Sequence, residues 1–450
     1  MNAPAEQFAQ AATCVAADVR QRAVIQRNIA TYDAAVARGK TRFADWENAR
    51  TRAAATKWET INHLDRYLEQ FERAVLDNGG HVFWAETAED ARRYILDVAR
   101  CNHVQRVVKS KSMTTEEIHL NGALGAAGIQ AVETDLGEYI CQIRGEPPYH
   151  IVTPVMHLTK SDIAETLGRP ATATAEELTM IARERLRREF LLADMGVTGA
   201  NFAIAETGQI AITENEGNAR LCFSLPRVHV GVVGIEKLLP CIEDLALFWP
   251  LLSTSGTGQA LTCYNSLVGG GENFHVVLLD NGRTRLLADA EQRDALHCIR
   301  CGACLNACPV FRNIGGHAYG TTYQGPIGSV ITPHLRGTEE WSHLPYASSL
   351  CGACTDVCPV KIELHHHLLH NRRNAVQQKL DSPVQRAAFR VWFWAMLSPA
   401  RYTVASRLAN LAVRCGIGRA LLRRWTDTRE FPAPPAQSFR EWWRQHGSQP

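Results

Sequence analysis

The segment CIRCGACLNACP, residues 298–309, most constrains what this chain can fold into. It places four cysteines at the spacing C-x2-C-x2-C-x3-C and ends in proline. This spacing is typical of iron–sulfur ligand runs, in which three thiolates hold one cubane and the fourth crosses to a second cluster. The ligands predicted from this run are Cys298, Cys301, Cys304 and Cys308.

A second run, CGACTDVCP at residues 351–359, supplies the partner that such a crossover needs. It also ends in Cys-Pro, where proline turns the chain and removes a backbone donor. Crossed pairing predicts a first cluster set of Cys298, Cys301, Cys304 and Cys358 and a second cluster set of Cys308, Cys351 and Cys354. Zinc is the alternative, but zinc sites usually combine two separated C-x2-C pairs, so the spacing favours iron–sulfur.

The second cluster set is one ligand short, because Ser348 stands where the first of four cysteines is expected. Several completions stay open: a [3Fe–4S] cluster, or a [4Fe–4S] cluster with Ser348, a histidine, a water or a distant cysteine on the odd iron. Two clusters in one small module would lie close enough to pass single electrons, which predicts electron transfer.

Length and cysteine usage limit the remaining possibilities. A chain of 450 residues exceeds a single domain of about 100–200 residues, so two or three folded units are expected. The start lacks a secretory signal, and 14 cysteines are too dilute for a secreted disulfide scaffold, which predicts a cytoplasmic protein. The longest uncharged stretch, residues 245–271, contains proline, glycine and polar residues, so no membrane span is predicted.

The pattern of apolar residues divides the chain into four regions. The pattern of residues 1–59 predicts an N-terminal helical segment with a poorly ordered end, and few functional residues are expected there. Residues 60–290 alternate strand and helix patterns, with buried strands such as HVGVVG and HVVLLD, and predict an α/β domain with a largely parallel sheet. Residues 291–372 predict a module with short helices built around the two clusters. Residues 373–450 predict a basic, Trp-rich helical C-terminal segment.

The α/β region lacks the known nucleotide-binding glycine motifs. The segment KSKS instead lies where a strand ends and a helix begins, a place that attracts carboxylate or phosphate. It predicts an anion site, with a solvated basic loop as the equal alternative. The residues of this predicted site are Lys109, Ser110, Lys111 and Ser112.

Two acidic segments, ETDLGE and TENEGNAR, contain candidate acid–base groups. The simpler interpretation is favoured for each of them, namely that the carboxylates cap turns and face solvent. The candidates are Glu133, Asp135, Glu138, Glu214 and Glu216.

Charge is unevenly distributed. Residues 373–450 carry 13 Lys/Arg and 4 Asp/Glu, a net charge of +9, whereas residues 1–372 have a net charge of −7. A basic tail on an acidic body favours docking to a protein partner, with weak attachment to a membrane surface as the alternative. No recognised nucleic-acid module is present, so no nucleic-acid partner is predicted.

Several long segments together show a family resemblance. The chain resembles the lactate-utilisation iron–sulfur protein B family (LutB) over nearly its whole length. The segments that carry the resemblance are KSKSMTTEEIHLN, ETDLGEYICQ, TGANFAIAETGQIAITENEGNAR, CIRCGACLNACPVFRNIGGHAYG, LPYASSLCGACTDVCPVKI and the Trp-rich basic tail.

The resemblance implies a lactate-utilisation (LUD) domain of the CoA-transferase-like α/β type, a two-cluster ferredoxin module and a family-specific C-terminal segment. It implies two [4Fe–4S] clusters held by the same seven cysteines, so the absent cysteine looks like a family trait. It also implies a role with two sister proteins in oxidising L-lactate to pyruvate, needed for growth on lactate.

Three functions follow as hypotheses. The first is an electron-transfer subunit of an L-lactate oxidising complex, passing electrons to an unidentified acceptor. The second is catalysis on a 2-hydroxy acid such as L-lactate at the open iron of the second cluster. The third is a redox-sensing or scaffold protein whose α/β domain binds a small anion.

Overall fold

The computed structural model describes residues 3–415, 435 and 437–447. The chain divides into two compact units, residues 1–378 and residues 379–450. The first unit therefore contains the predicted N-terminal, α/β and cluster regions together, and the limits predicted between those regions stay predictions.

A six-stranded sheet in which every pairing is parallel forms the centre of the α/β region. Its strands, in spatial order, are β1 (His81–Ala85), β10 (Phe274–Leu279), β7 (Val228–Gly234), β4 (Met195–Gly199), β2 (Arg106–Lys109) and β3 (Gln130–Glu133). All seven residues of β7 are buried, as a strand covered on both faces requires. The prediction of an α/β fold with a largely parallel sheet is confirmed.

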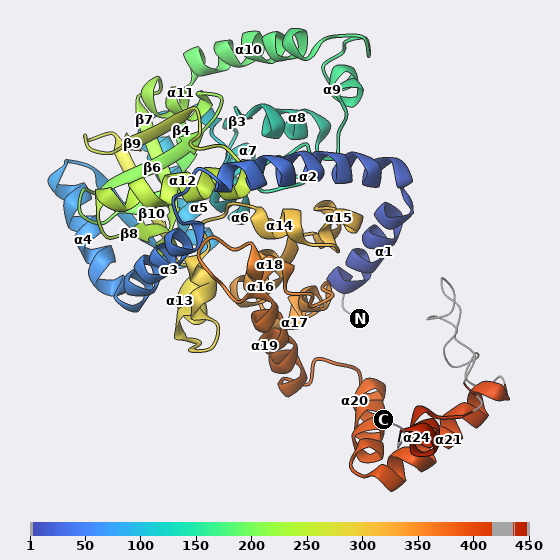
Figure 1. The fold of residues 1–450 in the computed structure, drawn as a ribbon. Helices are drawn as coiled ribbons and strands as arrows, with labels where there is room; N and C mark the ends of the chain where they lie inside the picture. Colours follow the sequence, from blue (N-terminus) through green and yellow to red (C-terminus); the bar gives the residue numbers. More distant parts are fainter. Residues whose placement is uncertain (1–2, 416–434, 436, 448–450) are drawn as a thin grey trace. The chain divides into compact units, whose positions relative to one another are not determined.

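Helices cover both faces of this sheet (Figure 1). On one face, α5 (Ala88–Cys101) and α7 (Leu120–Ala126) pack against valines of β2, β4 and β7. On the other face, α4 (Leu64–Asp77) packs against β7 and β10. The polar loops at the carboxyl ends of the strands are left for a site.

A smaller, mixed sheet shares a core with the first, and its strands fall between strands of the first sheet along the chain. Its strands are β8 (Leu238–Leu239), β5 (Phe202–Ile204), β6 (Gln209–Glu214) and β9 (Tyr264–Val268). The antiparallel pair β5–β6 forms a hairpin within the segment FAIAETGQIAITE. Its second strand ends at Glu214, where the acidic loop begins.

The cluster region consists of short helices, as its irregular sequence predicted. They are α14 (Ala303–Ala307), α15 (Phe311–Ile314), α16 (Gly325–Arg336), α17 (Thr338–Trp341), α18 (Ala353–Asp356) and α19 (Leu364–Gln377). Their apolar side chains share one core with the N-terminal helices α2 (Val19–Lys40) and α3 (Trp46–Asn62) and with α12 (Leu245–Thr257). The helix α2 runs alongside α14 and α15 (Figure 1).

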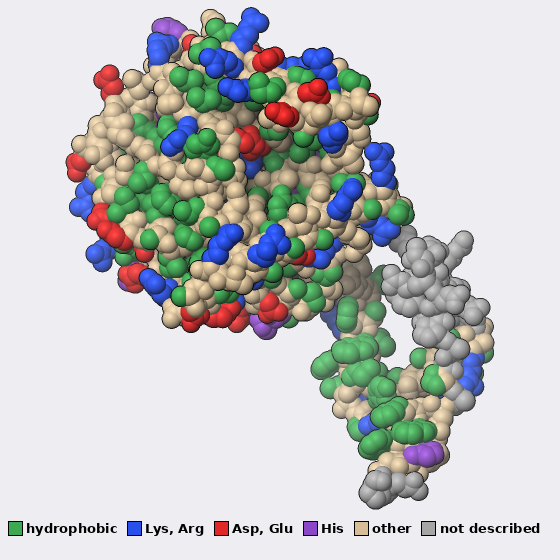
Figure 2. Space-filling view, turned by 45° about the horizontal axis from the view of Figure 1, so that its top comes forward, with side chains coloured by type: hydrophobic (Ala, Val, Ile, Leu, Met, Phe, Trp, Pro, Cys, Tyr) green, Lys and Arg blue, Asp and Glu red, His purple; other side chains and the backbone are tan. Residues whose placement is uncertain are grey.

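The second unit is helical, as predicted. Its described helices are α20 (Pro383–Met396), α21 (Pro399–Arg414) and α24 (Phe439–His446). Large apolar side chains lie exposed on it, including Phe389, Trp392, Phe393 and Trp394 (Figure 2). Residues 431–434 and 436 of the proline-rich segment FPAPPAQS (431–438) lie outside the described residues. None of the described helices has the length and apolar character that crossing a membrane requires.

Gly196 in β4 lets the backbone of a covering helix approach the parallel sheet closely. A Cβ atom there would collide with the carbonyl oxygen of Cys222 in α11 (Asn218–Ser224). We expect Gly196→Ala to lower the free energy of unfolding by about 1–3 kcal/mol, because backbone must move. Urea denaturation measures this loss.

Gly122 provides the control, since a Cβ atom there meets nothing within 4 Å. Gly122→Ala on the exposed side of α7 is expected to raise the free energy of unfolding by about 0.5–1 kcal/mol through helix propensity. Equal stabilities of the two variants would contradict the packing argument.

Candidate functional site

The seven cysteines of the cluster region lie in two neighbouring groups. Burial raises the thiol pKa of Cys301, backbone N–H groups lower it, and the neighbouring Cys298 and Cys358 raise it. The net effect is a raised pKa. Burial and then Cys308 raise the pKa of Cys354 to about 11. Burial and then the nearby Cys298, Cys301 and Cys354 raise the pKa of the Cys304 thiol, so the two groups of cysteines adjoin at Cys304. These neighbours match the crossed pairing, while the ligand assignment itself stays a prediction.

Backbone N–H groups point at two of these sulfurs. The N–H of Arg300 donates to Cys298 Sγ at 3.4 Å, and the N–H of Ile362 donates to Cys358 Sγ at 3.4 Å. The turns that aim them are strained: Arg300 has φ 61° and Lys361, just before Ile362, has φ 52°. A left-handed conformation costs a non-glycine residue about 1–2 kcal/mol, so tertiary contacts must hold both turns.

Cations surround the first cluster set. Arg50 of α3 donates from Nε to the carbonyl oxygen of Cys358 at 3.0 Å. Lys57, also on α3 and only 2% exposed, donates to the carbonyl oxygens of Glu236 and Leu238 at 2.6 and 3.2 Å. The N-terminal helices, for which the sequence predicted little chemistry, therefore supply part of the environment of this set.

The second cluster set is more open to solvent at one member, because Cys351 is exposed. Ser348 lies in the turn before it, where its hydroxyl accepts a hydrogen bond from the N–H of Leu350 at 3.1 Å. The Ser348 carbonyl accepts from Arg372 at 3.2 Å. Within the described residues, no three His, Cys, Asp or Glu side chains converge on a single-metal site. The fourth ligand of this set stays open.

A buried ion-pair network joins the α/β region to the cluster region. Arg283 on α13 (Arg283–Ala288) donates to Glu117 from Nη1 and Nη2 at 2.9 and 2.8 Å and to Glu236 from Nε at 2.5 Å. From the cluster region, Tyr323 donates to Glu117 at 2.6 Å and Arg300 pairs with Glu236 at 3.2 Å. The Glu236 side chain is thus shared between two guanidinium groups.

A cavity of 610 Å³ lies where the two regions meet. Loops that follow β2, β3, β4 and β6 form one side, and Arg300, Cys301 and Tyr323 of the cluster region contribute to the other. The carboxyl ends of parallel strands are the usual place for ligands in such sheets. One member of the first cluster set, Cys301, therefore borders the cavity.

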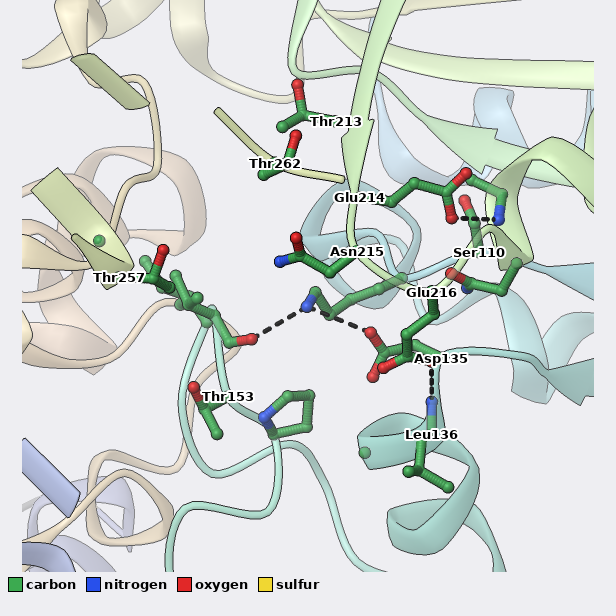
Figure 3. Close-up of a pocket in the computed structure, with 18 of the residues that line it drawn as sticks. Ser110, Asp135, Leu136, Thr153, Thr213, Glu214, Asn215, Glu216, Thr257 and Thr262 are labelled. Atoms are coloured by element: carbon green, nitrogen blue, oxygen red, sulfur yellow. Dashed lines mark hydrogen bonds and ion pairs between the residues drawn. The ribbon is translucent and has the colours of Figure 1, made fainter. Parts of the chain in front are cut away.

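One wall of the cavity is acidic (Figure 3). Asp135 pairs with Lys111 at 3.2 Å, and Glu216 accepts the Leu136 N–H at 2.9 Å. Enclosure by the protein, then the Asp135 carboxylate, raise the pKa of Glu216 to about 7. Burial likewise raises the pKa of Glu214. The expectation that these carboxylates are solvated turn caps is incomplete: Asp135 does cap α8 (Leu136–Arg144), but all three line the cavity.

The remaining acidic candidates lie behind this wall. Glu138 and Glu133 are 2% and 4% exposed and are not among the residues that line the cavity. Burial and the neighbouring carboxylates Glu133 and Asp135 raise the pKa of Glu138 well above its usual range. Both side chains are therefore buried, contrary to the expectation that they face solvent.

The other wall contains two cations that sequence reasoning missed. Lys237 follows β7 and is 6% exposed, and its ammonium group forms no hydrogen bond or ion pair with any described residue. The Arg300 side chain is 10% exposed and stacks on Tyr323 at 4.5 Å, while its Nη1 is buried without a hydrogen-bond partner in the described part of the chain. The sequence offered one signal for this wall, namely that Arg300 lies between the predicted ligands Cys298 and Cys301.

The predicted anion site separates into two parts. Ser110, Lys111 and Ser112 line the cavity. Lys109 does not: its ammonium group is buried on Glu133 at 2.6 Å and Asn121 at 2.8 Å. Burial opposes its charge, but Glu133 and Glu116 outweigh burial and raise the pKa of Lys109. Lys109 is thus already neutralised, and an anion there would rely on Lys111.

Three family models match the chain one after another. The LUD domain family matches residues 68–278, the 4Fe-4S dicluster domain matches residues 294–362, and the C-terminal domain of lactate utilisation protein B matches residues 363–448. The dicluster match supports iron–sulfur clusters in this chain.

Curated relatives match over most of the length. "Lactate utilization protein B" of Shouchella clausii is 46% identical over 423 residues, covering 89% of each chain. The protein of the same name from Oceanobacillus iheyensis is 44% identical and covers 89% of this chain and 88% of its own. A solved DUF162 family protein from Deinococcus radiodurans, 16% identical, covers 48% of this chain and 98% of its own with a TM-score of 0.28, too low to support an inference.

Proposed function

Because the chain belongs to the lactate utilisation protein B family, we propose that it carries electrons in a multi-subunit system that oxidises L-lactate to pyruvate. The observation that carries this proposal is that one small module contains two sets of cysteines. The first cluster set borders a cavity through Cys301, and the second cluster set reaches the surface at Cys351. Oxidation of L-lactate releases two electrons and two protons. A chain with two one-electron sites suits that number.

The proposal assigns two [4Fe–4S] clusters to the crossed cysteine sets. The donor chemistry fits, since the seven thiols lie in one module, where five are buried, Cys298 is half-buried and Cys351 is exposed. A buried thiolate is unfavourable without a cation, and the raised pKa values of Cys301, Cys304 and Cys354 reflect that cost. Iron supplies the missing positive charge when the cluster is present, and the loaded cluster accepts and returns one electron.

The surroundings of the two sets differ, which supports different roles for the two clusters in electron transfer. Arg50 and Arg300 place positive charge near the first set. Lys57 and Lys237 also lie there, but burial lowers the pKa of Lys57 to about 7 and that of Lys237 to about 8, so their charge is weaker. Positive charge favours the reduced form of a cluster, because reduction adds negative charge. The second set has the exposed Cys351 and suits exchange with a partner protein. Sister lactate-utilisation proteins are the proposed partners, and the final acceptor is a further component.

Growth provides the first test. In a strain that lacks the native gene, complementation with the double variant Cys298→Ala/Cys308→Ala is expected to give no growth on L-lactate and normal growth on pyruvate. The variant removes one thiol from each set, so lactate oxidation loses its electron outlet. Cys222→Ala, which removes a buried thiol outside the module, is the control and should restore growth on both.

Electron transfer itself requires a spectroscopic test. Full-length protein mixed anaerobically with its lactate-oxidising partners is expected to show the EPR signal of reduced clusters on addition of L-lactate. Clusters that stay oxidised while pyruvate accumulates would contradict the relay, even if the growth test succeeded.

A further inference from the structure

We propose that the cavity beside Cys301 binds an organic anion larger than lactate, and that Lys237 and Arg300 hold its carboxylate or phosphate group. The redox meaning of this site rests on the proposed function, because the ligand would lie against the first cluster set. The binding itself does not depend on electron transfer and is tested separately below.

The first argument is the excess of buried positive charge. Two carboxylates, Glu117 and Glu236, face the cations Arg283, Arg300 and Lys237. Arg283 already uses both carboxylates, and Arg300 shares Glu236. Lys237 is left without a hydrogen bond or ion pair among the described residues, although it is 6% exposed. A buried charge without a partner is costly, so its retention indicates a ligand of opposite charge.

Arg300 also has an unsatisfied donor of its own. Its Nη1 is a buried donor that no described residue accepts. Its backbone is left-handed, with φ 61°, and the contacts of its side chain with Glu236 and Tyr323 hold it there. Backbone strain that persists in this way is often part of a site. Lys237 and Arg300 both line the cavity, so an oxyanion bound there would meet both side chains and form charge-assisted hydrogen bonds with them.

The size of the cavity argues for a ligand larger than lactate. A volume of 610 Å³ lies within the range of about 300–1,000 Å³ of sites for drug-sized molecules. Apolar side chains cover part of the wall, from Ile140, Ile151, Val155, Ile163 and Leu178. A three-carbon acid would leave this surface wet, whereas a ligand with an apolar body would bury it.

Hydroxyl and amide groups complete the lining. Thr213, Asn215 and Thr262 lie together near the acidic wall, and Thr257 and Thr153 lie on the opposite side of the cavity (Figure 3). The Thr213 hydroxyl is buried with no partner in the described part of the chain. These groups suit a ligand with polar oxygens in addition to its acidic group.

Another explanation of the two cations is that they balance only the charge of the first cluster. The two explanations differ for a cluster-loaded protein: only a ligand site gives saturable binding of an external anion. The test therefore uses anaerobically purified full-length protein with its iron content and EPR signals verified.

Calorimetric titration with four matched probes tests the proposal. Pyruvate and phenylpyruvate share a carboxylate, and inorganic phosphate and phenyl phosphate share a phosphate. In at least one pair, the phenyl compound is expected to bind at least tenfold more tightly than its small counterpart, because the ring buries the apolar wall. The pair that binds identifies the acidic group. Bound anion should also shift the EPR signal of the first cluster and lower its potential, because added negative charge opposes reduction.

Lys237→Met is expected to weaken that binding at least tenfold without loss of thermal stability, since methionine fills the same space without a charge. Lys160→Met is the control, because Lys160 is an exposed lysine on the cavity rim, and it should bind within twofold of the native protein. Absence of binding by both phenyl compounds, no advantage of the ring, or equal binding by Lys237→Met would each overturn the site. Binding without lactate-driven reduction of the clusters would uphold the site and reject the relay.

Discussion

Replacement of Cys358 by alanine is expected to abolish the same cluster that is lost on replacement of Cys298, although the two residues stand at opposite ends of the module. Cys308→Ala and Cys351→Ala, as single variants, are each expected to abolish the other cluster. Crossed pairing is the reason, since the last cysteine of each run serves the far cluster. Burial and the Cys298 thiolate act on Cys358, whose pKa is raised to about 12, which supports this grouping.

Iron analysis and EPR on anaerobically purified variants measure this effect. The native protein should contain about eight iron atoms per chain, and each variant about half of that number. Cys222→Ala is again the control and should retain the full content. Loss of the same EPR signal in Cys308→Ala and Cys304→Ala would reject the crossed assignment in favour of one cluster per run.

Replacement of Arg283 by methionine should cause the largest loss of stability of any single charge removal in the first unit. Arg283 is 1% exposed and is the common partner of Glu117 and Glu236. Its removal leaves two buried carboxylates with too little positive charge, which costs about 3–5 kcal/mol. Urea denaturation of the cluster-loaded protein measures the loss.

Two variants separate charge from packing at this position. Arg285→Met, on the same helix but exposed, should change the free energy of unfolding by no more than about 0.5 kcal/mol. Adding Glu117→Gln to Arg283→Met should recover part of the loss, because one unpaired carboxylate is removed. If the double variant is less stable than Arg283→Met, the unpaired charge is not the cause.

The same network sets a dependence of stability on pH. Burial alone would raise the pKa of Glu236, but Arg283 and then Arg300 hold it at about 2. Because this folded-state value lies below the unfolded value of about 4.3, the stabilisation is present above that pH and is lost as pH falls from there towards 2. In Arg283→Met the folded-state pKa of Glu236 should rise towards or above the unfolded value, so the loss of stability on acidification should shrink or reverse. Urea midpoints measured between pH 6 and pH 3 show whether it does.

The parts of the fold that depend on local sequence could be predicted. Runs such as HVVLLD are apolar on both faces, which only a covered strand tolerates, and the structure places this run in the parallel sheet as β10. The cluster motif has the same local character, because thiolates that hold a cubane must be a fixed few residues apart. Its spacing therefore indicated the cofactor without knowledge of the rest of the chain.

The acidic wall was only half visible in the sequence. Asp135, Glu214 and Glu216 stood out as polar residues at the ends of predicted strands, but a carboxylate in a loop is usually solvated. What converts them into a site is the cluster region closing the other side of the cavity, which places Tyr323 and Arg300 opposite loops more than eighty residues earlier in the chain. No periodicity within either segment encodes that meeting.

The sequence by itself determined the two cysteine runs, the family, the α/β class and the question of what completes the second set at Ser348. Only the tertiary structure decided that Lys109 is neutralised by Glu133 while Lys237 forms no ion pair with any described residue, and that Arg50 and Lys57 of the N-terminal helices lie at the first set. The physical reason is that ligand spacing and strand burial act over a few residues. The partner of a buried charge is chosen by whichever distant segments pack around it.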